Sequence, residues 1–338
     1  MATKRTRRHP VRQTTISDIA ELAGVSKATV SRVMNGVPTV AEDIAERVRA
    51  AIDELGYTPS QTARSLSLGV SRTIGVLVPD LSNPMFHQVL HGVHRAAAAD
   101  GYRVLVADTL EDEAGEAASA IDIRNRTDAV VLIAPRMTRP ELLDLLPRVQ
   151  PVAVVNRTTG RNAAVAQVDY ATGIQTLAQH LVDLGHERIA FLSGPEASRS
   201  NHERLRGLIA FREAHPDIEI RELACGSGFE DGYRAWDAVR SSGATAVLAF
   251  NDIVALGLLG RLDEEGVRVP DDLSVTGFDD IPFSRYSAPP LTTMTVDLPG
   301  VGAAVWRELH DEIGGGLRRD PVVFTPALTV RASTGPRP

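Results

Sequence analysis

The stretch that decides the fold of the N-terminal part is "AELAGVSKATVSRVMNG", residues 20–36. Ala20 is small where two helices approach each other closely, and Gly24 suits a turn that needs a left-handed backbone. Val25 and Val30 can then fill the angle between the two helices. This spacing is typical of a helix-turn-helix. A plain helical hairpin with a solvated outer face is the alternative interpretation.

Helices on either side complete this small unit. Thr15 and Asp18 form a capping box that predicts the start of the first helix, and Ser26 can cap the second helix over roughly residues 27–34. Apolar residues at helical spacing predict a third helix from roughly residue 40 to 55. Together these signals predict a compact three-helix unit.

The second of these helices directs short polar side chains and cations away from the core. The set comprises Lys27, Ala28, Thr29, Ser31 and Arg32. Such side chains suit the base edges and phosphates of a DNA groove. In a plain helical hairpin, the same residues would form only a solvated face.

Charge is distributed unevenly along the chain. Residues 1–72 carry 11 Lys or Arg and 7 Asp or Glu, whereas the remainder carries 25 and 36. A basic N-terminal part on an acidic body indicates that this part meets an anion. For residues 1–13, the alternative is a disordered basic tail that contacts nothing.

The composition argues against several classes of protein. Cys225 is the only cysteine, which excludes a disulfide framework and a cysteine zinc site. The N-terminus lacks the apolar core of a signal peptide, and no apolar run approaches the roughly 18 residues that span a bilayer. We therefore expect a soluble, cytoplasmic protein. DNA binding by its N-terminal part would make it nucleoid-associated, and we expect it to need no cofactor.

From Arg72 onward, apolar runs alternate with helical stretches. A first series of runs begins with "TIGVLVPD" at 73–80, and a second begins with "RIAFLSG" at 188–194. Continuous apolar runs are typical of parallel strands buried on both faces, and their alternation with helices indicates doubly wound α/β layers. Eight such runs are too many for one modest sheet, so the pattern predicts two similar lobes.

Polar side chains follow these predicted strands, at the edge where doubly wound sheets bind ligands. They include Asp80, Ser82, Asn83, Asn156, Arg157, Asn251, Asp252, Asp279 and Asp280. Two lobes with such edges facing each other would form a cleft. An aspartate after a strand can instead cap the next helix, and this alternative stays open for Asp169 and Asp280.

Several longer motifs occur in a fixed order along the chain. They are "TTISDIAELAGVSKATVSRVMNG" (14–36), "VRAAIDELGYTPSQTARSL" (48–66), "GVLVPDLSNPMF" (75–86) and "LSVTGFDD" (273–280). With them, nearly the whole chain resembles the lactose/galactose repressor (LacI/GalR) family of bacterial transcriptional regulators. The resemblance implies a helix-turn-helix domain and a hinge helix, followed by a two-lobed α/β body similar to periplasmic sugar-binding proteins.

The resemblance also implies where the domains begin and end. These are a basic tail (1–13), a helix-turn-helix domain (14–58), a hinge helix (59–71) and an effector-binding and dimerisation body (72–338). Within the body, the N-lobe is expected over about 72–165 and 293–320, and the C-lobe over about 166–292 and 321–338. Crossings between the lobes are expected near 164–168, 290–293 and 320–322.

For DNA, the resemblance implies that Lys27 and Ala28 select operator bases. It implies further contacts to DNA for Thr15, Thr29, Ser31, Arg32, Asn35, Thr39 and Tyr57. Ala63 and Leu66 match the hinge helix, in which Leu66 would be an apolar wedge in the minor groove. Ala41 departs from the family, which usually has a capping serine there; Thr39 or the acids at 42 and 43 are candidates to compensate.

For the cleft, the resemblance implies a regulatory small molecule such as a sugar or related polyol. The matching positions are Asn83, Phe86, Asn156, Arg157, Arg204, Asn251 and Asp279. Asp279 could accept hydrogen bonds from two vicinal hydroxyls. Only one of Arg204 and Arg206 is expected to face inward. Ser227 stands where the family often has an aromatic platform, with Phe229 as the alternative.

Rival functions fit the sequence less well than a regulator does. A sugar-transport protein is opposed by the helix-turn-helix, and an enzyme is opposed by the lack of a recognisable catalytic set. His87, His91 and His94 share a helix face, but no carboxylate or cysteine joins them, so a solvated or subunit-facing stripe is favoured over a metal site.

We therefore expect a ligand-responsive repressor that binds a pseudo-palindromic operator in double-stranded DNA as a homodimer. Ligand binding between the lobes would be coupled to the pairing of the two hinges. Both release and corepression by the ligand remain open.

Overall fold

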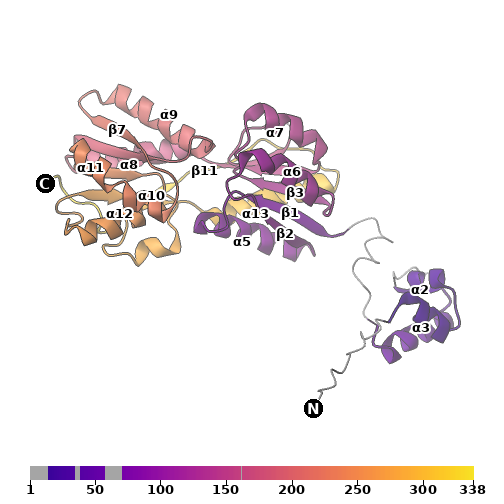
Figure 1. The fold of residues 1–338 in the computed structure, drawn as a ribbon. Coiled ribbons are helices and arrows are strands. Elements are labelled where there is room, and N and C mark those ends of the chain that lie inside the picture. The colour runs from indigo at the N-terminus through magenta and orange to yellow at the C-terminus, as the bar shows by residue number, and fades with distance from the viewer. Residues whose placement is uncertain (1–13, 35–38, 58–70, 161) are drawn as a thin grey trace, which may run out of the picture. The chain divides into compact units, whose positions relative to one another are not determined.

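The computed structural model describes residues 14–34, 39–57, 71–160 and 162–338. The chain divides into two compact units, with the border between Ser71 and Arg72 (Figure 1). The predicted basic tail and almost all of the predicted hinge helix lie outside the described residues. Among the residues that are described, no helix is both long and apolar enough to cross a membrane.

The described residues of the first unit form three helices: α1 (Ile16–Leu22), α2 (Lys27–Met34) and α3 (Glu42–Glu54). The predicted signals start and stop them. The Thr15 N–H donates to the Asp18 carboxylate at 2.7 Å, and the Thr29 N–H donates to Ser26 Oγ at 3.1 Å. Gly24 has a φ of 64° in the turn before α2. The helix-turn-helix spacing therefore folds as predicted.

A small apolar core joins these three helices. Ile19, Val30 and Val48, one from each helix, are fully buried. Val25 and Val33 pack against this core from the turn and from α2. Arg47 Nη2 also donates to the Ala23 carbonyl at 2.5 Å, which ties α3 to the end of α1. The core fixes the rotation of α2 about its axis, and thereby decides which side chains it exposes.

The described part of the second unit contains two large parallel sheets, one in each lobe, and a small two-stranded antiparallel sheet. The N-lobe sheet has the order β11-β5-β4-β3-β1-β2, and the C-lobe sheet has the order β7-β6-β8-β9. The N-lobe strands are β1 (Thr73–Val78), β2 (Arg103–Asp108), β3 (Ala129–Ile133), β4 (Val152–Val155), β5 (Ala164–Val168) and β11 (Val322–Phe324). The C-lobe strands are β6 (Arg188–Ser193), β7 (Glu219–Ala224), β8 (Ala246–Ala249) and β9 (Ser274–Thr276).

Helices cover both faces of each sheet, which explains why the central strands are apolar, whereas the edge strands β2, β7 and β11 include exposed residues. In the N-lobe they are α5 (Pro84–Ala99) and α13 (Leu298–Ile313) on one face, with α6 (Glu113–Arg124) and α7 (Arg139–Leu145) on the other. In the C-lobe they are α8 (Tyr170–Asp183) and α9 (Arg199–Ala214) on one face, with α10 (Phe229–Arg234), α11 (Trp236–Ser242) and α12 (Asp252–Glu264) on the other. The predicted two-lobed, doubly wound fold is confirmed.

The chain crosses between the lobes after β5, after β10 (Thr293–Thr295) and after β11. Because Val322 pairs with Ala166, both β5 and β11 are complete strands of the N-lobe sheet. The crossings predicted near 164–168 and 320–322 therefore lie a few residues too early. β10 instead belongs with the C-lobe, where it pairs with β12 (Ala327–Thr329). Hydrogen-bonded pairing between strands distant in sequence sets these borders.

Candidate DNA-recognition face and interlobe site

The outward face of α2 carries the side chains predicted to contact DNA. Lys27, Ala28 and Arg32 are exposed, whereas Val30 between them is buried. Thr29 is partly buried, and its hydroxyl lies 2.9 Å from Ser26 Oγ. The core contacts of α2 thus leave two cations and a methyl group pointing outward, on a helix that its own packing holds in place.

The remaining predicted DNA contacts are distributed around the same unit. Thr15 and Thr39 are exposed, and Tyr57 packs partly buried against the apolar core. Ala41 is the N-cap of α3 and supplies no side-chain hydrogen bond; Glu42 and Asp43 follow in the first turn, where acids favour the helix dipole. Predictions for Asn35, Ala63 and Leu66 fall outside the described residues.

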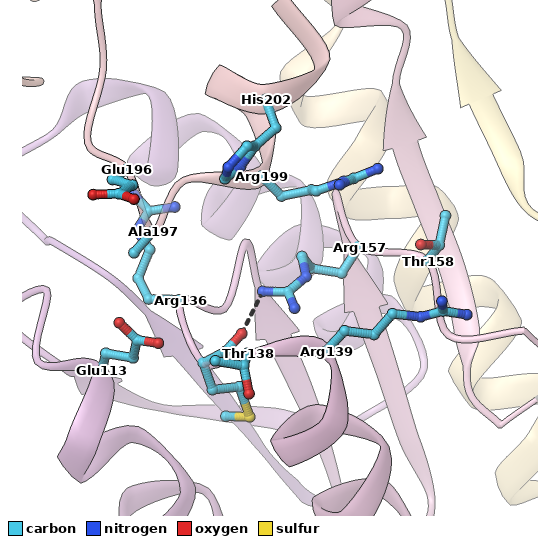
Figure 2. A pocket seen from close by; sticks show the side chains of 11 residues that line it. Glu113, Arg136, Thr138, Arg139, Arg157, Thr158, Glu196, Ala197, Arg199 and His202 are labelled. Carbon is cyan, nitrogen blue, oxygen red and sulfur yellow. Dashed lines mark hydrogen bonds between the residues drawn. The ribbon is translucent and has the colours of Figure 1, made fainter. Parts of the chain in front are cut away.

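A cavity of about 630 Å³ opens between the two lobes (Figure 2). Its N-lobe wall consists of Glu113, Arg136, Met137, Thr138, Arg139, Arg157 and Thr158. Its C-lobe wall consists of Glu196, Ala197, Arg199 and His202. A neighbouring cavity of about 380 Å³ shares Thr158 and Arg199 with it and is also lined by Asn156, Asp169 and Tyr170. A small molecule of sugar size fits this volume.

Two buried arginines shape the N-lobe wall. Arg157 is 7% exposed, and its Nη1 donates to the carbonyls of Pro135 at 2.5 Å and Met137 at 2.8 Å. Arg136 makes a bidentate ion pair with Glu111, at 2.5 and 2.8 Å. The segment after β3 is therefore held rigidly, and the two guanidinium groups differ: Arg136 is neutralised by a carboxylate, whereas Arg157 is anchored by carbonyl oxygens.

Arg204 and Asp279 form a buried polar pair inside the C-lobe, outside the linings of the two cavities. The Arg204 guanidinium is 4.2 Å from the ring centroids of Tyr170 and Phe278 and 4.6 Å from that of Phe250. Arg204 Nε and Asp279 Oδ1 are buried and have no hydrogen-bond partner among the described residues. Burial raises the pKa of Asp279 to about 8, against the opposing effect of the Arg204 charge. Such unsatisfied buried groups are costly and call for a functional explanation.

Three predicted ligand residues use their side-chain amides within the protein. Asn83 and Asn251 cap α5 and α12 by accepting from the N–H groups of Met85 and Val254, both at 2.9 Å. Asn156 donates to the Tyr170 hydroxyl and accepts from the Val168 N–H, again at 2.9 Å. These amides stabilise strand ends and helix starts, and their role toward a ligand stays a prediction. Phe86 is likewise buried, at 2% exposed.

The alternatives left open by the sequence are resolved in part. Asp169 caps α8 by accepting from the Thr172 N–H at 3.0 Å, whereas Asp280 forms an ion pair with Arg331 at 2.5 Å. Arg204 is buried inside the C-lobe and lines neither cavity, whereas the exposed Arg206 lines the smaller one, so which of them serves a ligand stays a prediction.

The two candidates for an apolar ligand platform also differ in position. Phe229 is 49% exposed, and the Ser227 carbonyl accepts from Asn251 Nδ2 at 3.1 Å. Neither residue is part of the linings of the two cavities. The histidines of α5 are exposed, and the described residues contain no cluster of three metal-ligating side chains.

Sequence reasoning missed most of the charged lining of the larger cavity. The missed residues are Glu113, Arg136, Arg139, Glu196, Arg199 and His202. A signal for part of this set was present, because Arg136 and Arg139 follow β3 at the strand edge where ligands bind. The contributions from α9 could not be read in this way, since they depend on how the two lobes face each other.

Comparisons with known proteins agree with this geometry. Residues 15–60 match the model for "Bacterial regulatory proteins, lacI family", and residues 178–334 match that for a "Periplasmic binding protein-like domain". The chain is 35% identical over 297 residues to the HTH-type transcriptional repressor PurR of Photobacterium profundum, with 83% of this chain and 86% of that protein covered.

Two solved structures are also similar. One is a lac repressor dimer bound to operator and the anti-inducer ONPF, with a TM-score of 0.84, 28% identity, and 96% of this chain and 100% of that chain covered. The other is a complex of the transcriptional regulator CelR with cellobiose, with a TM-score of 0.67, 26% identity, and 95% and 100% covered.

Proposed function

Because the chain belongs to the lacI family of bacterial regulatory proteins, and is a transcriptional repressor of that family rather than an enzyme, we propose a specific mode of repression. The protein binds a pseudo-palindromic operator as a homodimer, and a sugar-like ligand between its lobes regulates that binding. The observation that carries the proposal is the outward face of α2, which a separate core holds in a fixed orientation.

In this proposal, Lys27 and Ala28 select operator bases at the start of α2. Lys27 can donate to guanine acceptors, and Ala28 offers a methyl-sized apolar contact. The contacts proposed around them are those of Thr15, Thr29, Ser31, Arg32, Asn35, Thr39 and Tyr57. Ala63 and Leu66 act in a hinge helix over 59–71, with Leu66 as the wedge at the centre of the operator. The operator-bound lac repressor dimer supports the symmetric arrangement.

The ligand belongs to the cleft between the lobes in this proposal. The cavity of about 630 Å³ and the cellobiose complex of the similar regulator CelR support a sugar or related polyol as its class. Arg204 and Asp279, with their unsatisfied buried atoms, are the groups proposed to receive it when the lobes move. Asn83, Phe86, Asn156, Arg157 and Asn251 form the rest of the proposed site.

Selection of bound sequences from random double-stranded DNA, followed by gel retardation, tests the proposal. We expect a near-palindrome whose half-sites lie about one helical turn apart. Lys27→Ala should change the preferred half-site, and Leu66→Ala should weaken specific binding far more than non-specific binding. Recovery of an asymmetric site, or of no preferred site, would contradict the proposed mode. Equal losses on both DNAs for Leu66→Ala would contradict the wedge.

A further inference from the structure

Arginines from both lobes line the larger interlobe cavity. Figure 2 shows Glu113, Glu196 and Arg136 on one side, where Arg136 is paired with Glu111. Arg157 lies in the middle of the view, and the side chains of Arg139 and Arg199 extend to the other side. Arg139 and Arg157 come from the N-lobe, whereas Arg199 comes from α9 of the C-lobe. Cations from both lobes thus line a shared cavity, and the part lined by Arg139, Arg157 and Arg199 is called the arginine end below.

Arg157 is the fixed point of the arginine end. It is more than nine-tenths buried, and two backbone carbonyls hold its Nη1. Its remaining guanidinium N–H groups make no hydrogen bond to the described residues, although the side chain lines the cavity. Glu116 is the carboxylate that acts most strongly on the Arg157 charge, but it accepts from the backbone N–H groups of Arg136 and Met137, both at 2.8 Å. Arg157 therefore offers preorganised donors to a molecule in the cavity.

The other two arginines are exposed and adjustable. Within the described part of the chain, Arg139 forms no ion pair. Arg199 pairs with Glu203 at 2.5 Å, but Glu203 is shared with Arg206, so one carboxylate serves two cations. Because planar guanidinium groups bind phosphate and carboxylate oxygens through paired hydrogen bonds, this grouping suits an oxyanion.

We propose that the arginine end binds the oxyanion, a phosphate or a carboxylate, of an acidic ligand. This inference rests on the proposed function, because it concerns the same cleft ligand, and it makes that ligand a phosphorylated or acidic sugar rather than a neutral one. The oxyanion would contact Arg139 and Arg157 from one lobe and Arg199 from the other. Its binding would therefore hold the lobes together and supply the coupling to the DNA-binding unit.

The test compares charged ligands with neutral counterparts by thermal unfolding of the full-length protein. The probes are inorganic phosphate, glucose 6-phosphate and ribose 5-phosphate, against glucose and ribose, and gluconate against sorbitol. We expect a charged member to raise the melting temperature clearly more than its neutral counterpart does. A shift with the phosphates alone identifies a phosphate ligand, and a shift with gluconate alone identifies a carboxylate. Equal shifts within every pair, or no shift with any charged probe, would overturn the inference.

Matched variants assign the effect to the arginine end. Arg139→Gln and Arg199→Gln should each weaken binding of the active charged probe roughly tenfold, since each removes a charged hydrogen bond. Arg148→Gln and Arg212→Gln change exposed arginines outside the cavity lining and should bind as the wild type does. Unchanged binding by the first two variants would overturn the assignment.

Operator binding, measured on the same samples by gel retardation, separates this inference from the proposed function. A protein that binds a specific operator and responds to neutral sugars alone would overturn the acidic ligand and leave the repressor intact. A protein with no operator preference would contradict the proposed function itself.

Discussion

Val30→Ala tests whether the packing of α2 underlies operator recognition. Val30 is fully buried between the helices of the first unit. Its replacement removes two methyl groups, each worth about 0.8 kcal/mol of burial. A residual cavity adds to this loss, so we expect the unit to lose about 2–3 kcal/mol of unfolding free energy. A unit this small has only a few kcal/mol to lose.

Differential scanning calorimetry of the full-length protein should resolve the effect. The second unit has its own core, so its unfolding transition should stay in place while that of the first unit moves down by about 10 °C or more. Operator affinity should fall as the temperature approaches the new transition. Saturating operator DNA should partly restore the transition, because it binds only the folded unit.

The matched control is Leu22→Ala in α1, whose side chain is 46% exposed. This variant removes more atoms than Val30→Ala but should cost less than about 0.5 kcal/mol, because the side chain is already hydrated. An unchanged first transition in Val30→Ala, or an equal loss in both variants, would refute the reasoning from burial. Lost operator binding at an unchanged melting temperature would instead show that Val30 acts on DNA directly.

Three further predictions concern recognition, packing and pH. Lys27→Ala should weaken specific operator binding by about 1–3 kcal/mol, whereas Arg32→Ala should weaken binding to all DNA sequences alike and reduce the slope of log affinity against log salt concentration by about 1. Gel retardation at several salt concentrations distinguishes the two variants, and equal behaviour would contradict this division of roles. Gly92→Ala should destabilise the body by about 1–3 kcal/mol in urea unfolding, because a Cβ there would lie 2.1 Å from a carbonyl oxygen of α13. Gly260→Ala, whose Cβ would have no atom within 4 Å, should be neutral or stabilising. A larger loss of stability in Gly260→Ala than in Gly92→Ala would contradict this reasoning from packing. Burial raises the pKa of Asp279 to about 8, so this group stabilises the fold fully below its unfolded pKa near 4, and the contribution is lost as the pH rises to about 8. Asp279→Asn should therefore flatten the fall in unfolding free energy between about pH 5 and 8, measured by urea unfolding. An unaltered fall would show that other groups cause it.

Much of the fold follows from local patterns in the sequence. The capping pair Thr15 and Asp18 and the left-handed Gly24 act between residues close in the chain, so they could be read without knowledge of the tertiary structure. The apolar runs of the body are equally direct, because strands covered on both faces exclude polar residues. These signals predicted the helices, the strands and the division into two lobes.

The ligand site was predicted less completely, for a physical reason. The rule of polar strand ends found Asn156 and Arg157, which line the cavities, but it also selected Asn83 and Asn251, whose amides cap helices. A strand-end residue can serve a helix start or a ligand, and the sequence pattern is the same for both. Only hydrogen-bond geometry distinguishes the two roles.

The sequence by itself thus determined the helix-turn-helix, the outward residues of α2 and the two-lobed body, because each depends on neighbours within a few turns or strands. Tertiary structure alone decided where the chain crosses from one lobe to the other, because the pairing of β11 with β5 joins segments that are distant in the sequence. It also decided the electrostatic character of the cleft. Arg139 and Arg199 lie in separate lobes, and only the packing of one lobe against the other brings their charges to the same cavity.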